Sequence, residues 1–129
     1  MLSRARAFSA SLTTAAAARE FLHGTLRSWG CEHLEEVAVM LANEVVSNAV
    51  LHARSEVGLS VRLANHVLRV EVSDRDPSLP RLRPPVAEVG TGGRGLLLVD
   101  ALSSRWGSRP HGEGKVVWFE LEADDQPRW

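Results

Sequence analysis

The segment LEEVAVMLANEVVSNAVLHA, residues 34–53, has the clearest periodicity in this chain and predicts an amphipathic α-helix. One half of that helix is wholly apolar and should face a core, at Ala38, Val39, Ala42, Val45, Val46, Ala49 and Val50. The other side carries polar groups on successive turns, at Glu44, Asn48 and His52. A carboxylate and an amide placed in this way can accept a proton and ligate Mg²⁺, although a solvated helix face explains the same residues.

Further helices and strands are predicted on both sides of this helix. Helical spacing of apolar residues predicts two more helices, and strict alternation of apolar and polar residues predicts a hairpin that turns near Asn65. A proline- and glycine-rich stretch reads as a long loop. In chain order the elements are a weakly patterned strand within residues 2–10, helix 13–28, helix 34–53, strands 59–63 and 68–72, loop 75–93, helix 94–102, and strands 105–109 and 115–122.

Composition and element order indicate one globular domain over residues 1–129. The chain is 44% hydrophobic and 24% charged, and its helices are grouped apart from its hairpin-joined strands. An α+β two-layer sandwich fits best, with a mixed, mainly antiparallel sheet covered by helices on one face. The net charge of −1 disfavours direct nucleic-acid binding, although fourteen of the fifteen basic residues are Arg. The longest apolar run, residues 37–42, is far shorter than the ~20 residues that span a membrane.

Two other clusters could carry chemistry. Asp74-Arg75-Asp76-Pro77 directly follows an apolar strand, where carboxylates can accept hydrogen bonds from a ligand amine or hold a metal. Ordinary turn chemistry explains the same four residues. Gly90-Thr91-Gly92-Gly93-Arg94-Gly95 leads into a helix, and backbone amides at such a junction can approach phosphate oxygens. A flexible linker would have a similar composition.

Taken together and in this order, the three clusters resemble the GHKL group of ATP-binding domains, which histidine kinases, gyrase-type ATPases, certain chaperones and anti-sigma-factor serine kinases share. The segment Glu44 to Ala53 resembles the N box of the group. Asp74 begins a segment that resembles the first glycine box, and Gly93-Arg94-Gly95-Leu96 resembles the second. The likeness extends over nearly the whole chain to small stand-alone members that are abundant in actinobacteria, and the Arg-rich composition fits a GC-rich genome.

The resemblance implies a histidine-kinase-like ATPase fold with ATP and Mg²⁺ as ligands. It makes Glu44 the general base, Asn48 the Mg²⁺ ligand and Asp74 the acceptor of the adenine amino group. It also makes residues 78–92 a lid over the phosphates. The remaining nucleotide-binding candidates are Asp76, Gly92, Gly93, Arg94, Gly95 and Leu96.

The chain departs from the family pattern at two places. Arg75, Asp76 and Pro77 stand where the first glycine box usually continues into glycines, which predicts a different backbone path under the adenine. Val116 stands where many relatives have a threonine just after the lysine, so a hydroxyl that could help to fix the base is missing.

The resemblance implies a cytoplasmic regulatory serine/threonine kinase. Such a protein phosphorylates an anti-anti-sigma antagonist of the STAS type and thereby controls a sigma factor, and relatives suggest a homodimer. The alternative is a regulatory module that binds ATP or a protein without catalysis. A third reading, metal-dependent hydrolysis by His52, Asp74 and Asp76, lacks the close histidine spacing of the usual metal motifs.

Overall fold

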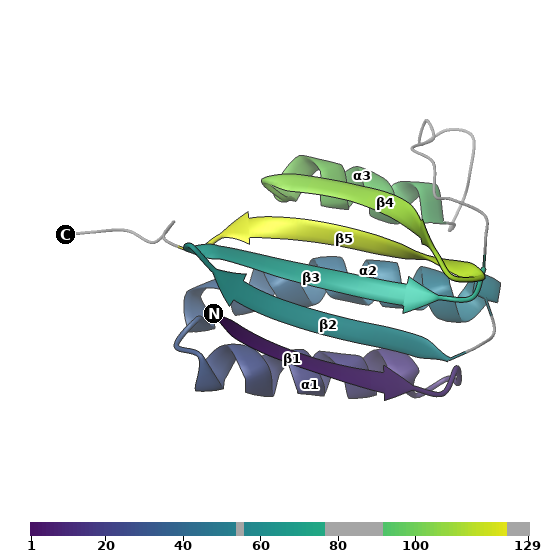
Figure 1. Cartoon of the computed structure of the whole chain (residues 1–129), viewed down its shortest axis with the longest axis horizontal. Helices are drawn as coiled ribbons and strands as arrows, with labels where there is room; N and C mark the ends of the chain where they lie inside the picture. The colour runs from purple at the N-terminus through teal and green to yellow at the C-terminus, as the bar shows by residue number, and fades with distance from the viewer. Residues whose placement is uncertain (54–55, 77–91, 124–129) are drawn as a thin grey trace.

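A sheet forms one layer of the molecule and helices form the other, as the sequence predicted (Figure 1). The structure is a computed structural model that describes residues 1–53, 56–76 and 92–123. The elements are β1 (Leu2–Phe8), α1 (Thr14–Ser28), the 3₁₀ helix η1 (Glu32–Leu34), α2 (Glu35–Ala53), β2 (Val57–Ala64), β3 (Val67–Asp74), α3 (Gly92–Leu102), β4 (Arg105–His111) and β5 (Gly114–Glu122).

The predicted helices and strands all form, with small shifts at their ends. The weakly patterned N-terminal stretch is a strand, β1, and α3 begins two residues earlier than predicted, at Gly92. The turn between β2 and β3 is formed by Asn65 and His66, with φ angles of 52° and 64°. A two-residue hairpin turn needs this left-handed backbone, which Asn adopts more readily than most residues. Most of the predicted loop, at residues 77–91, lies outside the described residues.

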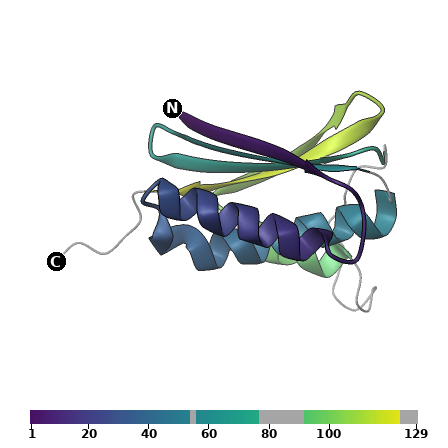
Figure 2. The same ribbon diagram turned by 90° about the horizontal axis from the view of Figure 1, so that it is seen from below.

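The five strands lie in the order β1-β2-β3-β5-β4, and each pairing between them is antiparallel. Figure 2 shows the helices on one face of this sheet and the opposite face uncovered. Helix α2 packs between α1 and α3 and also contacts β2 and β3. Figure 1 shows that α2 and β3 end at the same end of the molecule, where α3 and β5 begin. This arrangement brings together segments that are far apart in the sequence.

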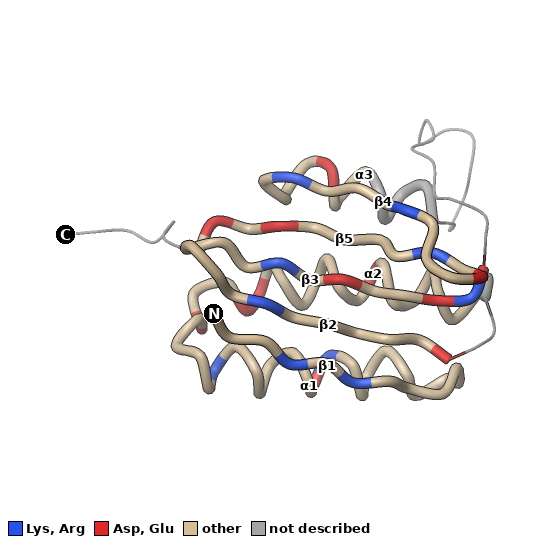
Figure 3. The backbone as a smooth tube through the Cα atoms, viewed as in Figure 1, with Lys and Arg blue, Asp and Glu red and all other residues tan. Residues whose placement is uncertain are grey.

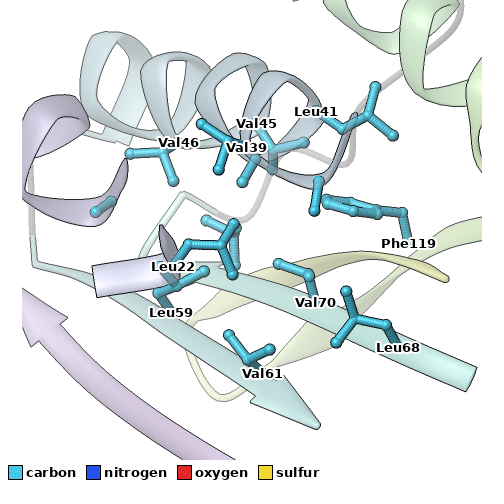
Figure 4. Close-up of a cluster of buried hydrophobic side chains, with 14 of the residues drawn as sticks. Leu22, Val39, Leu41, Val45, Val46, Leu59, Val61, Leu68, Val70 and Phe119 are labelled. Atoms are coloured by element: carbon cyan, nitrogen blue, oxygen red, sulfur yellow. The ribbon is translucent and has the colours of Figure 1, made fainter. Parts of the chain in front are cut away.

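The hydrophobic core lies between the sheet and the helices (Figure 4). Val70 of β3 and Phe119 of β5 are partners in register and are both almost fully buried. Leu22 of α1 and Val46 of α2 close the core from the helical side, with exposed fractions of 0% and 1%. Burying one side chain of this size stabilises the folded state by about 1.5–3 kcal/mol, because apolar surface is removed from water. The rotation of α2 is therefore set by its apolar half, as predicted.

Figure 3 marks residues of both charges along β3 and β5. Several of them form ion pairs on the uncovered face of the sheet. Arg69 donates hydrogen bonds to Glu71 at 2.7 Å and to Glu120 at 2.8 Å, and its guanidinium lies 4.0 Å from the centre of the Trp118 ring. Burial by itself would raise the pKa of Glu71, but the hydrogen bond and charge of Arg69 lower it overall. Arg109 adds a longer ion pair to Glu71, at 3.6 Å.

A smaller charged cluster joins α1 to the start of α2. His23 of α1 shares a hydrogen bond with the Glu35 carboxylate, and Arg27 donates to the same oxygen at 3.0 Å. The pKa of Glu35 is lowered, chiefly by the hydrogen bond with His23 and further by the charge of Arg27. The carboxylate also lies in the first turn of α2, where negative charge interacts favourably with the helix dipole.

A lowered pKa in the folded state predicts how stability depends on pH. The interactions of the ionised Glu35 carboxylate stabilise the folded state fully above the pKa that Glu has in the unfolded chain, about 4.3. This stabilisation is lost as the pH falls through the lower pKa of the folded state. Glu35→Gln should therefore lower the urea midpoint at pH 7, and the difference from the wild type should shrink only below about pH 4. Glu36→Gln, a neighbouring exposed acid, is the control. A difference that stayed constant down to pH 3 would contradict this assignment.

Candidate functional site

The three clusters picked out in the sequence lie in segments that meet at one end of the molecule (Figure 1). Helix α2 carries Glu44 at its middle and Asn48 one turn later, and the helix ends at that end of the molecule. Strand β3 ends there at Asp74, and α3 begins there at Gly92. The core between the sheet and the helices holds these elements in place. The end of α2, the end of β3 and the start of α3 thus lie at the same end of the molecule.

Glu44 and Asn48 are positioned by their apolar neighbours on α2. Val45 and Ala49 are 5% and 4% exposed and pack in the core, which turns the residues before them toward the helix surface. Glu44 and Asn48 are half-buried, and neither has a hydrogen bond or ion pair with another residue in the described part of the chain. Their carboxylate and amide are therefore available to a ligand. The side chain of His52, the third member of the stripe, lies outside the described residues.

The Asp74 carboxylate is buried and already engaged, with a side chain only 3% exposed. Its Oδ1 accepts the backbone N–H of Asp76 at 2.8 Å and the Lys115 ammonium at 3.2 Å, and its Oδ2 lies 3.0 Å from the same ammonium. A carboxylate has about four acceptor positions, so these three contacts leave one on Oδ2. That remaining position can accept one further donor.

Lys115 lies directly opposite Asp74 in the sheet, a neighbour that the sequence did not predict. Its ammonium also reaches the carbonyl oxygen of Asp76 at 3.3 Å and the Asp76 carboxylate at 3.7 Å. Asp76, a predicted nucleotide-binding residue, is thus tied to the same cation as Asp74. One signal was visible in the sequence, because Lys115 is the one lysine of the chain and directly precedes the apolar run from Val116 to Phe119.

Val116 has a smaller effect on the base pocket than the sequence suggested. The register between β3 and β5 is regular, so Val116 points to the opposite face of the sheet from Asp74 and Lys115. It lines a groove of about 490 Å³ on the uncovered face, together with small residues such as Ala5 and Gly58 and charged residues such as Glu71 and Arg109. A hydroxyl at this position would therefore point away from Asp74.

The second glycine box forms the first turns of α3. The backbone of residues 92–96 is helical, while the side chains of Arg94 and Leu96 lie outside the described part of the structure. The first N–H groups of a helix have no partner within it and carry partial positive charge, which suits phosphate oxygens. The predicted lid, residues 78–92, lies outside the described residues except at Gly92.

The donors present suit Mg²⁺ better than a metal caged by the protein alone. Among the described residues, no three His, Cys, Asp or Glu side chains lie together as a metal site. Mg²⁺ commonly takes one or two protein ligands and completes its shell with water and phosphate oxygens. The amide oxygen of Asn48 is an available ligand of this kind, and the carboxylate of Glu44 lies one turn away.

Comparisons with known proteins show the family of this chain. The family model for the histidine kinase-like ATPase domain matches residues 8–121. The Streptomyces coelicolor protein SCO4941 is 35% identical over 82 residues, which cover 60% of this chain and 77% of that protein.

Solved structures have the same fold. The structure of the RsbU and RsbW domains of Rv1364c from Mycobacterium tuberculosis has a TM-score of 0.72 at 20% identity, over 95% of this chain and 32% of that one. The histidine kinase domain of a blue-light activated kinase from Erythrobacter litoralis has a TM-score of 0.54 at 26% identity, over 71% and 46%. The chain thus spans about a third and about half of these two proteins.

No described helix is long and apolar enough to cross a bilayer.

The family match covers most of the sequence, including the α2 stripe, the β3 end and the start of α3. The chain therefore belongs to the histidine kinase-like ATPase domain family, whose ligand is ATP.

Proposed function

We propose that this chain is an ATP-dependent serine/threonine kinase that acts on a regulatory protein. The observation that carries the proposal is the pair Glu44 and Asn48, half-buried and without partners among the described residues. They lie in the second half of α2, which ends where β3 ends and α3 begins. The family supplies ATP as the ligand. The likeness to small anti-sigma-factor kinases indicates a STAS-type antagonist as the substrate and a sigma factor as the second partner.

Each group has a distinct task in this proposal. When bound, Mg-ATP supplies the phosphoryl group and the charge of the metal. Glu44 accepts the proton of the attacking serine hydroxyl, and Asn48 offers its amide oxygen to Mg²⁺. Asp74 accepts a hydrogen bond from the amino group of the base, and the N–H groups at the start of α3 face the phosphates. Transfer of this kind depends on positioning and on charge neutralisation more than on covalent catalysis.

The first test is whether the chain binds the nucleotide and transfers phosphate. Calorimetric titration with Mg-ATP should show saturable binding to the wild type, and Asn48→Ala should weaken it by at least about tenfold by removing the metal ligand. Incubation with Mg-ATP and a serine-bearing STAS-domain protein should then yield phosphoserine, detected by mass spectrometry. Absence of phosphoserine in the wild-type reaction would contradict the kinase assignment.

A second candidate function is a binding module without catalysis. One observation favours it: Asp74 already contacts Lys115, and Asp76 stands where the family has a glycine. Binding of a sigma factor or an antagonist that is unaffected by Asn48→Ala, together with no phosphoserine, would support this module. Dimerisation and a cytoplasmic location are part of the kinase proposal because they follow from the same family likeness.

A further inference from the structure

The two edges of the sheet differ in how open they are to another strand. Strand β1 forms one edge and β4 forms the other (Figure 1). Only β2 pairs with β1, so about half of the backbone N–H and C=O groups of β1 point away from the sheet. In β4, Pro110 lacks an N–H and hinders the addition of a strand. Strand β1 contains no proline, and its residues from Leu2 to Ala7 are all exposed, so it is the more open edge.

Strand β1 also carries positive charge that the described structure leaves unbalanced. Its charged residues are Arg4 and Arg6, and it contains no acidic residue (Figure 3). The Arg4 guanidinium lies 5.2 Å from the centre of the Phe21 ring, and the Arg6 guanidinium lies 5.2 Å from the centre of the Phe8 ring. Neither arginine has an ion pair with a carboxylate in the described part of the chain. The two aromatic contacts place both exposed guanidinium groups on the helical side of the strand.

The arginines of the other edge already have partners. Arg105 lies 3.7 Å from Glu120 and Arg109 lies 3.6 Å from Glu71, so carboxylates of neighbouring strands balance their charge. A carboxylate from another molecule would compete with these internal partners at β4. At β1 it would meet guanidinium groups that no described carboxylate pairs with. Charge complementarity therefore favours an acidic partner at the β1 edge.

The opposite face of β1 is lined by small side chains. Ala5 and Ala7 point to the uncovered face of the sheet, because they alternate along the strand with Arg4 and Arg6. Together with Gly58 they line the part of the 490 Å³ groove that lies nearest this edge. These small residues leave room for the side chains of a strand added beside β1. The two faces of β1 thus suit two different kinds of side chain.

We propose that the β1 edge binds an extended acidic segment of another protein, which adds to the sheet as a further strand. Residues two apart on a strand share a face, so alternate carboxylates of the segment would lie beside Arg4 and Arg6. The apolar residues between them would lie beside Ala5 and Ala7. Backbone hydrogen bonds supply affinity in this mode, and the alternation supplies specificity. This inference goes beyond the proposed function and does not depend on it, because the edge lies apart from α2, β3 and α3 in the sequence.

A second copy of this chain fits the β1 edge poorly. Two β1 strands paired antiparallel about Ala5 would place Arg4 of each copy opposite Arg6 of the other. Parallel pairing in register would place each arginine opposite its own counterpart. Like charges directly opposite one another destabilise a strand pair. The favoured occupant is therefore a different chain with acidic residues at alternate positions.

The experiment measures the binding of labelled synthetic peptides to the wild-type chain by fluorescence anisotropy. The first peptide alternates Glu and Val, the second alternates Lys and Val, and the third is the first peptide with N-methylated backbone amides. The third keeps the carboxylates but cannot donate the hydrogen bonds of a strand. Only the first peptide should bind saturably. It should also slow the hydrogen exchange of the β1 amides, which attachment through charge alone would not do.

Variants of the chain test the two arginines. Arg4→Gln combined with Arg6→Gln should raise the Kd of the Glu-Val peptide at least about threefold, as expected from the loss of two exposed ion pairs. Arg62→Gln is the matched control, because it removes an exposed arginine from the neighbouring strand β2. It should change the Kd by less than about 1.5-fold. An equal effect of the control and the double variant would overturn the role of Arg4 and Arg6.

The peptide comparisons use the wild-type chain, so they decide the question even if the double variant does not fold. Equal binding of the N-methylated peptide would overturn the inference, since charge would then act without strand pairing. No binding of the Glu-Val peptide would also overturn it. So would slowed exchange in β1 that increases with protein concentration without peptide, because a second copy would then occupy the edge. Titration with Mg-ATP tests the proposed function separately, and the β1 variants should bind Mg-ATP like the wild type.

Discussion

Glu44→Gln is expected to lower the rate of phosphoryl transfer by at least about 10²-fold, which is the lower end of the contribution of a general base. The Kd for Mg-ATP should change by less than about threefold, since glutamine has the same shape and keeps an amide oxygen at this position. A fall in turnover without a fall in binding is what separates the base from the groups that hold the nucleotide.

The structure supports this expectation through the surroundings of Glu44. The residue lies at the middle of α2, and the buried Val45 and Val46 beside it fix the helix rotation. Its carboxylate has no partner among the described residues, so glutamine should break no internal ion pair. A stability loss is therefore not expected to obscure the kinetic effect.

The measurement is single-turnover formation of phosphoserine on a STAS-domain protein at saturating Mg-ATP. Glu36→Gln is a matched control, since it makes the same change at an exposed position two turns earlier on α2. It should transfer phosphate at the wild-type rate. Wild-type transfer by Glu44→Gln would show that another group accepts the proton or that the hydroxyl needs no base.

Local patterns in the sequence were sufficient to predict the helices, the strands and the polar stripe. Period-2 alternation marked β2 and β3 because one face of each strand is buried against helices. Helical periodicity placed Glu44 and Asn48 on the side of α2 away from the core for the same reason. Both predictions depend on neighbours within a few residues, which a sequence shows directly.

Contacts between distant segments could not be predicted in this way. Strand β5 lies between β3 and β4, so Asp74 meets Lys115, which is 41 residues later in the chain. The pairing depends on strand order and register, and alternation alone determines neither. The same limit explains why Val116 was expected to affect the base pocket, although the register places its side chain on the other face of the sheet.

A glycine at the start of β5 makes that pairing possible. Gly114 lies against the backbone at the end of β3, just beyond the Asp74–Lys115 pair. A Cβ atom added there would lie 2.5 Å from the Cα of Arg75 and 2.7 Å from the carbonyl carbon of Asp74, and closer still to the carbonyl oxygen. These are backbone atoms, so no side-chain rotation can relieve the overlap.

Gly114→Ala is therefore expected to destabilise the protein by about 3 kcal/mol, the upper part of the usual range for overpacking. Urea unfolding followed by circular dichroism measures this change. Gly24→Ala is the matched control, because it adds the same methyl group in the interior of α1. Apart from its chain neighbours and the backbone of its own helix, the added Cβ atom would have no atom within 4 Å. Loss of glycine from an open helix position should stabilise the protein by about 0.5–1 kcal/mol.

The opposite signs of these two effects make the prediction specific to the close approach of β5 and β3. Separating the strands at Gly114 would also pull Lys115 away from Asp74, so any Gly114→Ala protein that remains folded should bind Mg-ATP more weakly than the Gly24→Ala protein. A Gly114→Ala protein that is as stable as the wild type would mean that the end of β3 and the start of β5 lie farther apart than in this structure. The buried contact between Lys115 and Asp74 would then lack its structural basis.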